Sequence, residues 1–191
     1  MSRVRKRKEG TEKGKKSVSK RIFGWAFQIV VVIALAYVMV YFLGQTRTNI
    51  GQSMEVTISG GDVVMLNEFS YKLQDPKQGD IISFKPNGST NSHSYIKRVI
   101  GLPGQTVQIK EGIIYINDKV YLEKNDYPAI TNAGLAEQPI VLGTTEYFVL
   151  GDNRNNSEDS RFAAVGNVEL NDIEGKVWFI ISSKEHFGFV K

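Results

Sequence analysis

The first change of pattern along the chain is from a polar, basic segment to an unbroken apolar one. Residues 1–21 hold ten Lys/Arg and two acids, whereas residues 22–43 hold no charge and Gln28 as their one strongly polar side chain. At about 1.5 Å per residue, a helix over residues 22–43 spans roughly 33 Å, enough to cross a hydrocarbon core of about 30 Å. Trp25 and Tyr37 stand towards its two ends, as aromatic residues do at membrane interfaces. The pattern predicts one transmembrane helix.

Two other interpretations of this segment fit less well. A cleaved signal peptide has an apolar region of about 7–15 residues followed by a small-x-small site. The apolar region here is longer, and the sequence after residue 43, Gly-Gln-Thr-Arg, offers no such site. A helix buried in a soluble domain would carry a polar stripe along one face, which this segment lacks.

After residue 44 the apolar positions come in short runs separated by turn formers. The runs cover residues 62–66, 80–84, 94–100, 106–110, 113–116, 119–122, 146–150 and 176–181. Short strands at this spacing predict a mainly β domain over residues 44–191, an antiparallel β-sandwich or barrel-like fold. Asn117 and Asp118 form a predicted two-residue hairpin turn. Residues 123–145 carry turn formers and two prolines, and are predicted to be a loop or a weakly ordered insertion.

The charge distribution predicts an orientation in the membrane. Residues 1–21 carry +8 (ten basic, two acidic), and the rest of the chain carries −4 (14 basic, 18 acidic). Because basic flanks stay in the cytoplasm, we expect a single-pass protein of the cell membrane with residues 1–21 inside and residues 44–191 outside. The basic tail is expected to be a solvated, disordered arm that contacts anionic lipid. The apolar segment beside it argues against nucleic acid as its partner.

The composition narrows the chemistry. The chain has no cysteine and two histidines. Neither a disulfide framework nor a thiol nucleophile is available, and a zinc site would lack its usual ligands. The sequence therefore predicts neither a metal nor a cofactor.

Lys97 is an unusual residue for its position, because it stands inside the apolar run 94–100. A lysine in a strand pattern is most often a solvated surface charge. The alternative is an amine held in a dry place, where burial disfavours the ammonium form and the neutral amine can act as a general base. The strand alone favours the surface charge.

Two further segments are rich in polar residues. Ser53 lies ten residues after the apolar segment, at most about 33–36 Å of extended chain, and taken alone it reads as an ordinary turn serine. The loop 151–161 follows an apolar strand and is dense in Asp, Asn and Ser, which stabilise tight loops by bonding to backbone amides. It lacks the regular carboxylate spacing of a calcium loop. His93 fits a surface position better than a catalytic one.

Together and in this order, these segments resemble the type I signal peptidases, membrane-bound Ser/Lys proteases that remove signal peptides. The resemblance covers the apolar helix and nearly all of the outer domain. It is carried by Ser53-Met-Glu-Val-Thr57, Gly79-Asp-Ile-Ile-Ser-Phe84, Lys97-Arg-Val-Ile-Gly-Leu-Pro-Gly104 and Gly151-Asp-Asn-Arg-Asn-Asn-Ser-Glu-Asp-Ser-Arg161.

The resemblance implies a role for each matching residue. Ser53 is the expected nucleophile and Lys97 the general base; Ser157 orients the lysine amine, and Asp159 and Arg161 brace the loop. The expected substrate is a signal-peptide-bearing preprotein with small residues such as alanine at −1 and −3 from the cut. It would bind as an added strand against residues expected to form the oxyanion and substrate sites: Gly51, Gln52, Tyr95 and Ile96. A secretion translocon is a candidate partner.

Three positions depart from the family pattern. Val56 stands where proline is usual, and we expect an extended backbone there with a small change in rigidity. Gln105 replaces an acid and is expected to alter a turn contact. Gly51 replaces a serine whose hydroxyl assists the oxyanion site in some members, so backbone groups must supply more of that stabilisation here.

Three alternatives remain open at this point. A non-catalytic relative, serving as a chaperone or scaffold in surface-protein assembly, would need neither Ser53 nor Lys97, and both are present. A membrane-anchored binding domain would leave the joint match of Ser53, Lys97 and Ser157 unexplained. A self-cleaving repressor of the Ser/Lys type would have no reason for the apolar helix.

Overall fold

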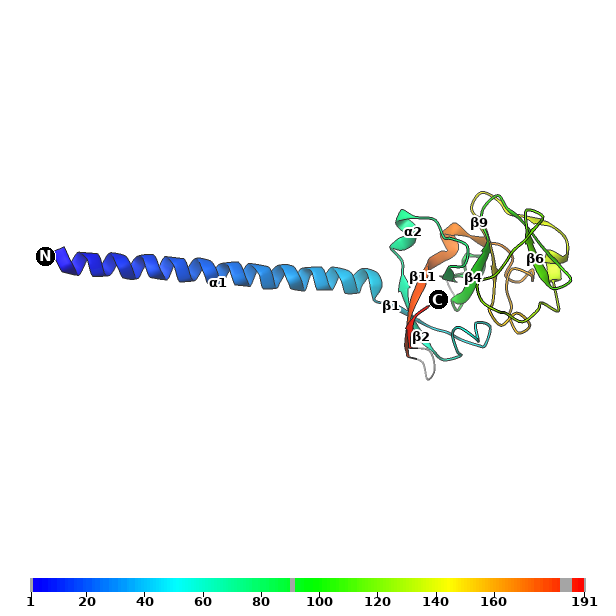
Figure 1. Ribbon diagram of the computed structural model, residues 1–191, viewed down its shortest axis with the longest axis horizontal. Helices are drawn as coiled ribbons and strands as arrows, with labels where there is room; N and C mark the ends of the chain where they lie inside the picture. Colours follow the sequence, from blue (N-terminus) through cyan, green and yellow to red (C-terminus); the bar gives the residue numbers. More distant parts are fainter. Residues whose placement is uncertain (1, 90–91, 183–186, 191) are drawn as a thin grey trace. The chain divides into compact units, whose positions relative to one another are not determined.

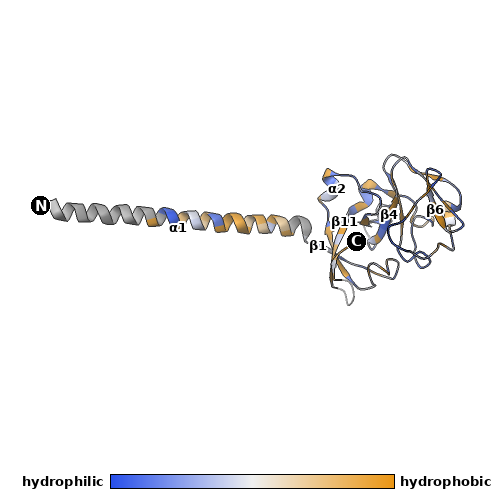
Figure 2. Ribbon diagram, viewed as in Figure 1, coloured by the Kyte–Doolittle hydropathy of each residue, from blue (hydrophilic) through white to orange (hydrophobic). Residues whose placement is uncertain are grey.

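The computed structural model describes residues 2–89, 92–182 and 187–190, and divides into two compact units, residues 1–41 and 42–191. The described residues of the first unit all belong to helix α1 (Ser2–Leu43), which ends two residues beyond that unit (Figure 1). Its stretch Lys20–Val40 has a mean hydropathy of 2.3 and is long and apolar enough to cross a membrane (Figure 2). The helix also includes the basic residues 2–21, which were expected to be disordered. Lys, Arg and Glu are good helix formers, and extending an existing helix avoids the cost of nucleation.

The second unit is a β domain built from two antiparallel sheets, which confirms the predicted fold class. The larger sheet has the order β1-β2-β11-β3-β4-β9-β10 with β12 beside β11, and the smaller has the order β7-β6-β5-β8. The strands of the larger sheet are β1 (Gln45–Thr48), β2 (Val63–Asn67), β3 (Ile81–Phe84), β4 (Tyr95–Gly101), β9 (Glu146–Leu150), β10 (Val168–Glu169), β11 (Ile173–Ser182) and β12 (Gly188–Phe189). Those of the smaller sheet are β5 (Thr106–Lys110), β6 (Ile113–Ile116), β7 (Lys119–Val120) and β8 (Ile140–Val141).

Short helical turns occupy some of the connections, and two tight turns fix the register of the smaller sheet. The helical turns are α2 (Ser70–Leu73), η1 (Pro86–Gly88), η2 (Gly134–Glu137) and η3 (Leu170–Asp172). Asn117 and Asp118 both have positive φ, 51° and 62°, as the predicted two-residue hairpin between β6 and β7 requires. Glu111 and Gly112 form the matching turn between β5 and β6, also with positive φ.

The buried side chains group into three apolar clusters on the sheets. One of them includes Ile130, Ala136 and Leu142, so the segment 123–145 contributes to the core although most of it is irregular. Apolar side chains spaced along a loop in this way tie it down, which the turn-rich pattern alone does not reveal. The segment is therefore better packed than the expected weakly ordered insertion.

Strand β4 lies in the middle of the larger sheet, and its position makes the site possible. It pairs with β3 on one side, with Lys97 opposite Ile82, and with β9 on the other, with Arg98 opposite Leu150. Both of its charged residues are buried, Lys97 with 4% and Arg98 with 7% of its surface exposed. Because side chains alternate along a strand, the two cations point to opposite faces of the sheet.

Candidate active site

The turn that carries Ser53 connects β1 to β2. The side-chain amide of Asn49 closes its base by donating to the carbonyl oxygens of Ile58 at 3.2 Å and Ser59 at 3.0 Å. Within the turn, the Ile58 amide donates to the Met54 carbonyl at 2.8 Å, and both side chains are fully buried. Side chains four residues apart lie on one face of a helical turn, so these two anchor it to the core and hold the half-buried Ser53 in a defined place.

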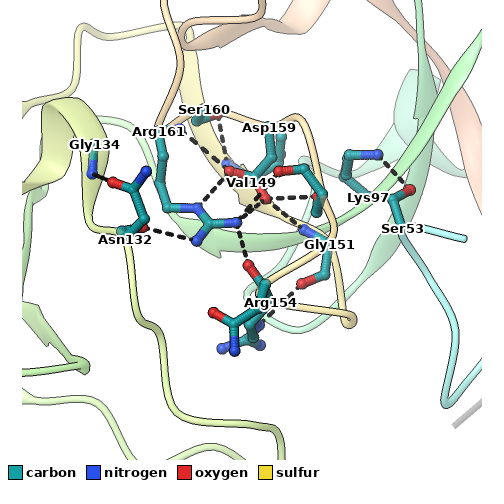
Figure 3. Close-up of polar contacts among 12 residues, drawn as sticks. Ser53, Lys97, Asn132, Gly134, Val149, Gly151, Arg154, Asp159, Ser160 and Arg161 are labelled. Carbon is teal, nitrogen blue, oxygen red and sulfur yellow. Dashed lines mark hydrogen bonds and ion pairs between the residues drawn. The ribbon is translucent and has the colours of Figure 1, made fainter.

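Lys97 reaches Ser53 from β4. Its Nζ donates to Ser53 Oγ at 2.7 Å, and the two side chains point towards one another (Figure 3). The Tyr95 ring, two residues earlier on the same face of the strand, has its centroid 5.2 Å from Nζ. The fold thus brings together the two residues that the sequence nominated, from segments 44 residues apart.

Burial changes the acidity of this amine. It lowers the pKa of Lys97 from 10.5 to about 8, because the dry surroundings disfavour the ammonium form. The carboxylates of Asp159, Glu158 and Asp152 act in the opposite direction and limit the fall. The resulting pKa leaves a substantial neutral fraction at mildly alkaline pH, which a general base needs.

The loop 151–161 is organised around the buried carboxylate of Asp159. Its oxygens accept from Arg161 Nε at 2.8 Å, from the Gly151 amide at 3.1 Å and from the Ser157 hydroxyl at 2.7 Å. Arg161 also donates to the Arg154 carbonyl at 2.6 Å, which ties the middle of the loop to its end. These contacts join Asp159 and Arg161 in a buried ion pair inside the loop, and their role as its brace stays a prediction (Figure 3).

The placement of Ser157 differs in detail from the expectation. Its hydroxyl donates to Asp159, and no hydrogen bond between Ser157 and Lys97 is found in the described part of the chain. With its proton engaged, this hydroxyl has only lone pairs to offer the amine. The orientation of Lys97 by Ser157 therefore stays a prediction.

A groove of about 300 Å³ opens over Ser53 and Lys97. It is lined by all four residues that the sequence nominated for the oxyanion and substrate sites, Gly51, Gln52, Tyr95 and Ile96. Its remaining described lining comes from Asn49, Ile50, His93, Ser94, Asn156 and Glu158. His93 is exposed and is a groove residue as well as the surface histidine that was expected.

Comparison with known proteins agrees with this geometry. Residues 22–182 match the family described as "Signal peptidase, peptidase S26". The chain belongs to this family. It is a serine endopeptidase of the signal peptidase I type, which confirms the resemblance, and nothing in the comparisons favours a non-catalytic relative.

Individual relatives match over most of their length. Signal peptidase I T of Bacillus subtilis (strain 168) is 36% identical over 79% of this chain and 81% of its own. A signal peptidase I of Bacillus amyloliquefaciens is 34% identical over 91% and 92%. A crystal structure of a signal peptidase I from Enterococcus faecalis V583 is 30% identical and covers 55% of this chain and 97% of its own, with a TM-score of 0.41.

At Val56 the peptidase has a backbone that the sequence did not predict. Its φ is +94°, so the expected extended conformation is wrong. A β-branched residue is strained at positive φ, and the proline usual in the family cannot adopt it, because its ring holds φ near −65°. The turn just after Ser53 therefore has a backbone conformation here that proline cannot adopt.

The other two departures are accommodated locally. The side-chain oxygen of Gln105 accepts from the Leu102 amide at 2.8 Å, a contact that a carboxylate oxygen makes equally well. Gly51 has φ +95°, and a Cβ there would meet nothing within 4 Å. A side chain would fit the space at Gly51, but the backbone favours glycine.

The structure also contains a second buried ion pair, which the sequence did not nominate and which lies next to the turn that carries Ser53. Arg98 donates to Asp152 through Nε at 2.8 Å and Nη2 at 2.7 Å, and Asp152 also accepts from the Thr57 hydroxyl at 2.6 Å. The pair therefore links β4 to the turn that carries Ser53. Arg98 stands beside Lys97 in an apolar strand, so the sequence indicated that Arg98 needs a partner. It did not indicate that the partner is Asp152.

A third cation, Arg154, is held by the segment after β7. Glu123 accepts from both Nη atoms of Arg154 at 2.5 Å, and the Tyr127 ring has its centroid 4.4 Å from the guanidinium carbon. Arg154 Nε in turn donates to the Gly151 carbonyl at 3.0 Å. Nothing in the loop-like sequence around Glu123 and Tyr127 pointed to this support.

Gly151 lies in close contact with the turn that carries Ser53. A Cβ there would lie 2.2 Å from Ser157 Oγ and 2.4 Å from the Ser53 carbonyl oxygen, so only glycine fits. The Asn153 amide also donates to that carbonyl, at 3.0 Å. Among residues 2–89, 92–182 and 187–190, no three His, Cys, Asp or Glu side chains gather as a metal site would require.

Proposed function

We propose that Ser53 is the nucleophile of this signal peptidase and that Lys97 is its general base. The observation that carries the proposal is the 2.7 Å contact between Lys97 Nζ and Ser53 Oγ inside a groove that can take a peptide. A serine hydroxyl becomes an effective nucleophile when a neighbouring base removes its proton. The burial of Lys97 supports that role, because it favours the neutral amine.

The reaction follows from these positions. Neutral Lys97 takes the proton of Ser53 Oγ as the oxygen attacks the scissile carbonyl carbon, and the Ser53 backbone N–H stabilises the developing oxyanion. The Lys97 ammonium then gives the proton to the departing amine, which leaves an acyl group on Ser53. Water, deprotonated by Lys97, releases the signal peptide and restores the hydroxyl.

The substrate is proposed to bind in an extended form. The groove lies between the turn residues 49–52 and the start of β4, so a peptide can add to the edge of these segments by main-chain hydrogen bonds. Alternate side chains of such a strand face the same way. Small residues at −1 and −3 would then both point into the groove, which fits an Ala-x-Ala-type site.

The location of the protein is proposed from its charge and its surface. The basic residues 1–21 would stay in the cytoplasm against anionic lipid, α1 would cross the membrane, and residues 44–191 would work at the outer face. Phe187 and Phe189 are each 72% exposed and give the domain an apolar edge that could contact lipid. A translocon that delivers preproteins is a candidate partner.

The test uses the full chain in detergent with a preprotein that carries an Ala-x-Ala site. Wild type should cleave it, whereas Ser53→Ala and Lys97→Ala should lose at least about 10³-fold in rate. Lys110→Ala, at an exposed position of β5, is the matched control and should cleave normally. Equal cleavage by wild type and both active-site variants would refute the assignment.

A further inference from the structure

Glu158 differs from every other residue of the active-site groove. Among the described residues that line the groove it is the only acid, and its side chain is exposed. Its carboxylate accepts a long hydrogen bond, 3.3 Å, from the Tyr95 hydroxyl. An exposed carboxylate with one weak partner retains most of its capacity to accept hydrogen bonds.

The two other carboxylates that act on Lys97 are already paired. Asp159 is bound by Arg161 and Asp152 by Arg98, and both acids are fully buried. Glu158 forms no ion pair within the described ranges of the chain. Its charge therefore faces the groove without a salt-bridge partner among the described residues, and Lys97 feels it only at longer range.

The charge of the groove favours a substrate that places a positive side chain near Glu158. The reaction needs neutral Lys97, so in the working state Glu158 is the carboxylate that gives the described lining of the groove its negative charge. Tyr95 and Lys97 stand two residues apart and face the same side of β4. A peptide that lies along this edge passes Tyr95, whose hydroxyl contacts Glu158, and then the catalytic pair.

We propose that Glu158 is a specificity-determining residue, which pairs with a lysine or arginine side chain of the preprotein close to the cut. The inference rests on the proposed function, because it places the substrate in the same groove. An exposed ion pair of this kind should favour the basic substrate about two- to fivefold. The preference should shrink as salt rises from about 0.01 M to about 1 M, because screening shortens the reach of the charge.

The experiment compares matched peptides that share one Ala-x-Ala site. Lys, Gln or Glu is placed in turn at each residue around the cut, except at the two small ones, and kcat/KM is measured for each peptide. The enzymes are wild type, Glu158→Gln, Glu158→Lys and the control Glu137→Gln, which changes an exposed acid outside the groove. At one position, wild type and the control should prefer Lys over Gln, Glu158→Gln should prefer neither, and Glu158→Lys should prefer Glu.

The outcomes separate this inference from the proposed function. The same Lys-to-Gln ratio in wild type, Glu158→Gln and Glu158→Lys would overturn the role of Glu158, while cleavage of the Gln peptides would still support the Ser53–Lys97 pair. Cleavage of the Gln peptides by Ser53→Ala at the wild-type rate would overturn the proposed function instead. If Glu158→Lys fails to fold, the comparison of wild type with Glu158→Gln still decides.

Discussion

Lys97 and Arg98 are neighbours on β4 and almost equally buried, but they point to opposite faces of the sheet. The pKa of Lys97 is lowered, whereas that of Arg98 is raised. On one face, burial lowers the pKa of Lys97 to about 8. On the other, burial also opposes the charged form, but the hydrogen bonds and the charge of Asp152 outweigh it and raise the pKa of Arg98. Burial alone therefore does not decide the state of a buried cation.

The difference lies in what each cation contacts. Arg98 has a carboxylate in direct, two-point contact, whereas Lys97 has a hydroxyl at 2.7 Å and an aromatic ring. The buried carboxylate that acts most strongly on the pKa of Lys97, that of Asp159, is engaged by Arg161. The fall in the pKa of Lys97 corresponds to about 3 kcal/mol against the ammonium form. One face of the strand thus keeps a charged guanidinium paired with a carboxylate, and the other holds the amine that we propose as the base.

The largest expected effect comes from placing the wrong cation on the catalytic face. Lys97→Arg introduces a guanidinium that stays protonated at any usable pH, so it cannot take the proton of Ser53. We expect a loss of about 10³-fold or more in kcat/KM for a preprotein. Lys110→Arg, made at an exposed position, should cleave at the wild-type rate. Cleavage by Lys97→Arg within about threefold of wild type would show that proton transfer by Lys97 is dispensable.

The second effect comes from removing the support on the other face. Asp152→Asn removes the carboxylate charge that buried Arg98 contacts at two points, which we expect to lower the free energy of unfolding by about 3 kcal/mol. Denaturant unfolding followed by tryptophan fluorescence measures the change. Lys176→Gln is the control, because its ion pair with Asp80 is part exposed, with 38% of the lysine side chain accessible, and should cost about 1 kcal/mol or less. Equal losses in the two variants would mean that burial of the pair adds nothing.

The contacts on one face of β4 could be predicted from the sequence, whereas those on the other face could not. The meeting of Ser53 and Lys97 could be predicted, because each of them, like the loop 151–161, lies in a continuous motif that resembles a family. The hairpin at Asn117 and Asp118 could be predicted as well, because a two-residue turn depends on local backbone preferences. In each case the information lies within a few residues of chain.

The supporting face could not be predicted, because its contacts depend on the fold. Thr57 meets Asp152 across 95 residues, and Glu123 meets Arg154 across 31, in a segment that reads as loop. The positive φ of Val56 is equally hidden, since valine favours the extended backbone that was expected there. Such a conformation persists only where the surrounding structure imposes it, here through the buried anchors on either side.

The mildest way to test the comparison is to change pH. This changes the charge of Lys97 on one face of β4 and leaves Arg98 on the other face charged. The proposed mechanism needs neutral Lys97, so kcat/KM should follow the deprotonated fraction of a group with a pKa of about 8. The rate should level off above that pH and fall about tenfold per unit well below it, a drop of about 50-fold between about pH 8 and pH 6. Arg98 stays protonated throughout, so the domain should remain folded, which circular dichroism can check at each pH.

Because the charge of Glu158 favours the ammonium form of Lys97, Glu158→Gln should move the midpoint of the profile to lower pH. A flat rate over this range with the fold intact would contradict a lysine base, and a midpoint unmoved by Glu158→Gln would mean that solvent screens that carboxylate from the amine.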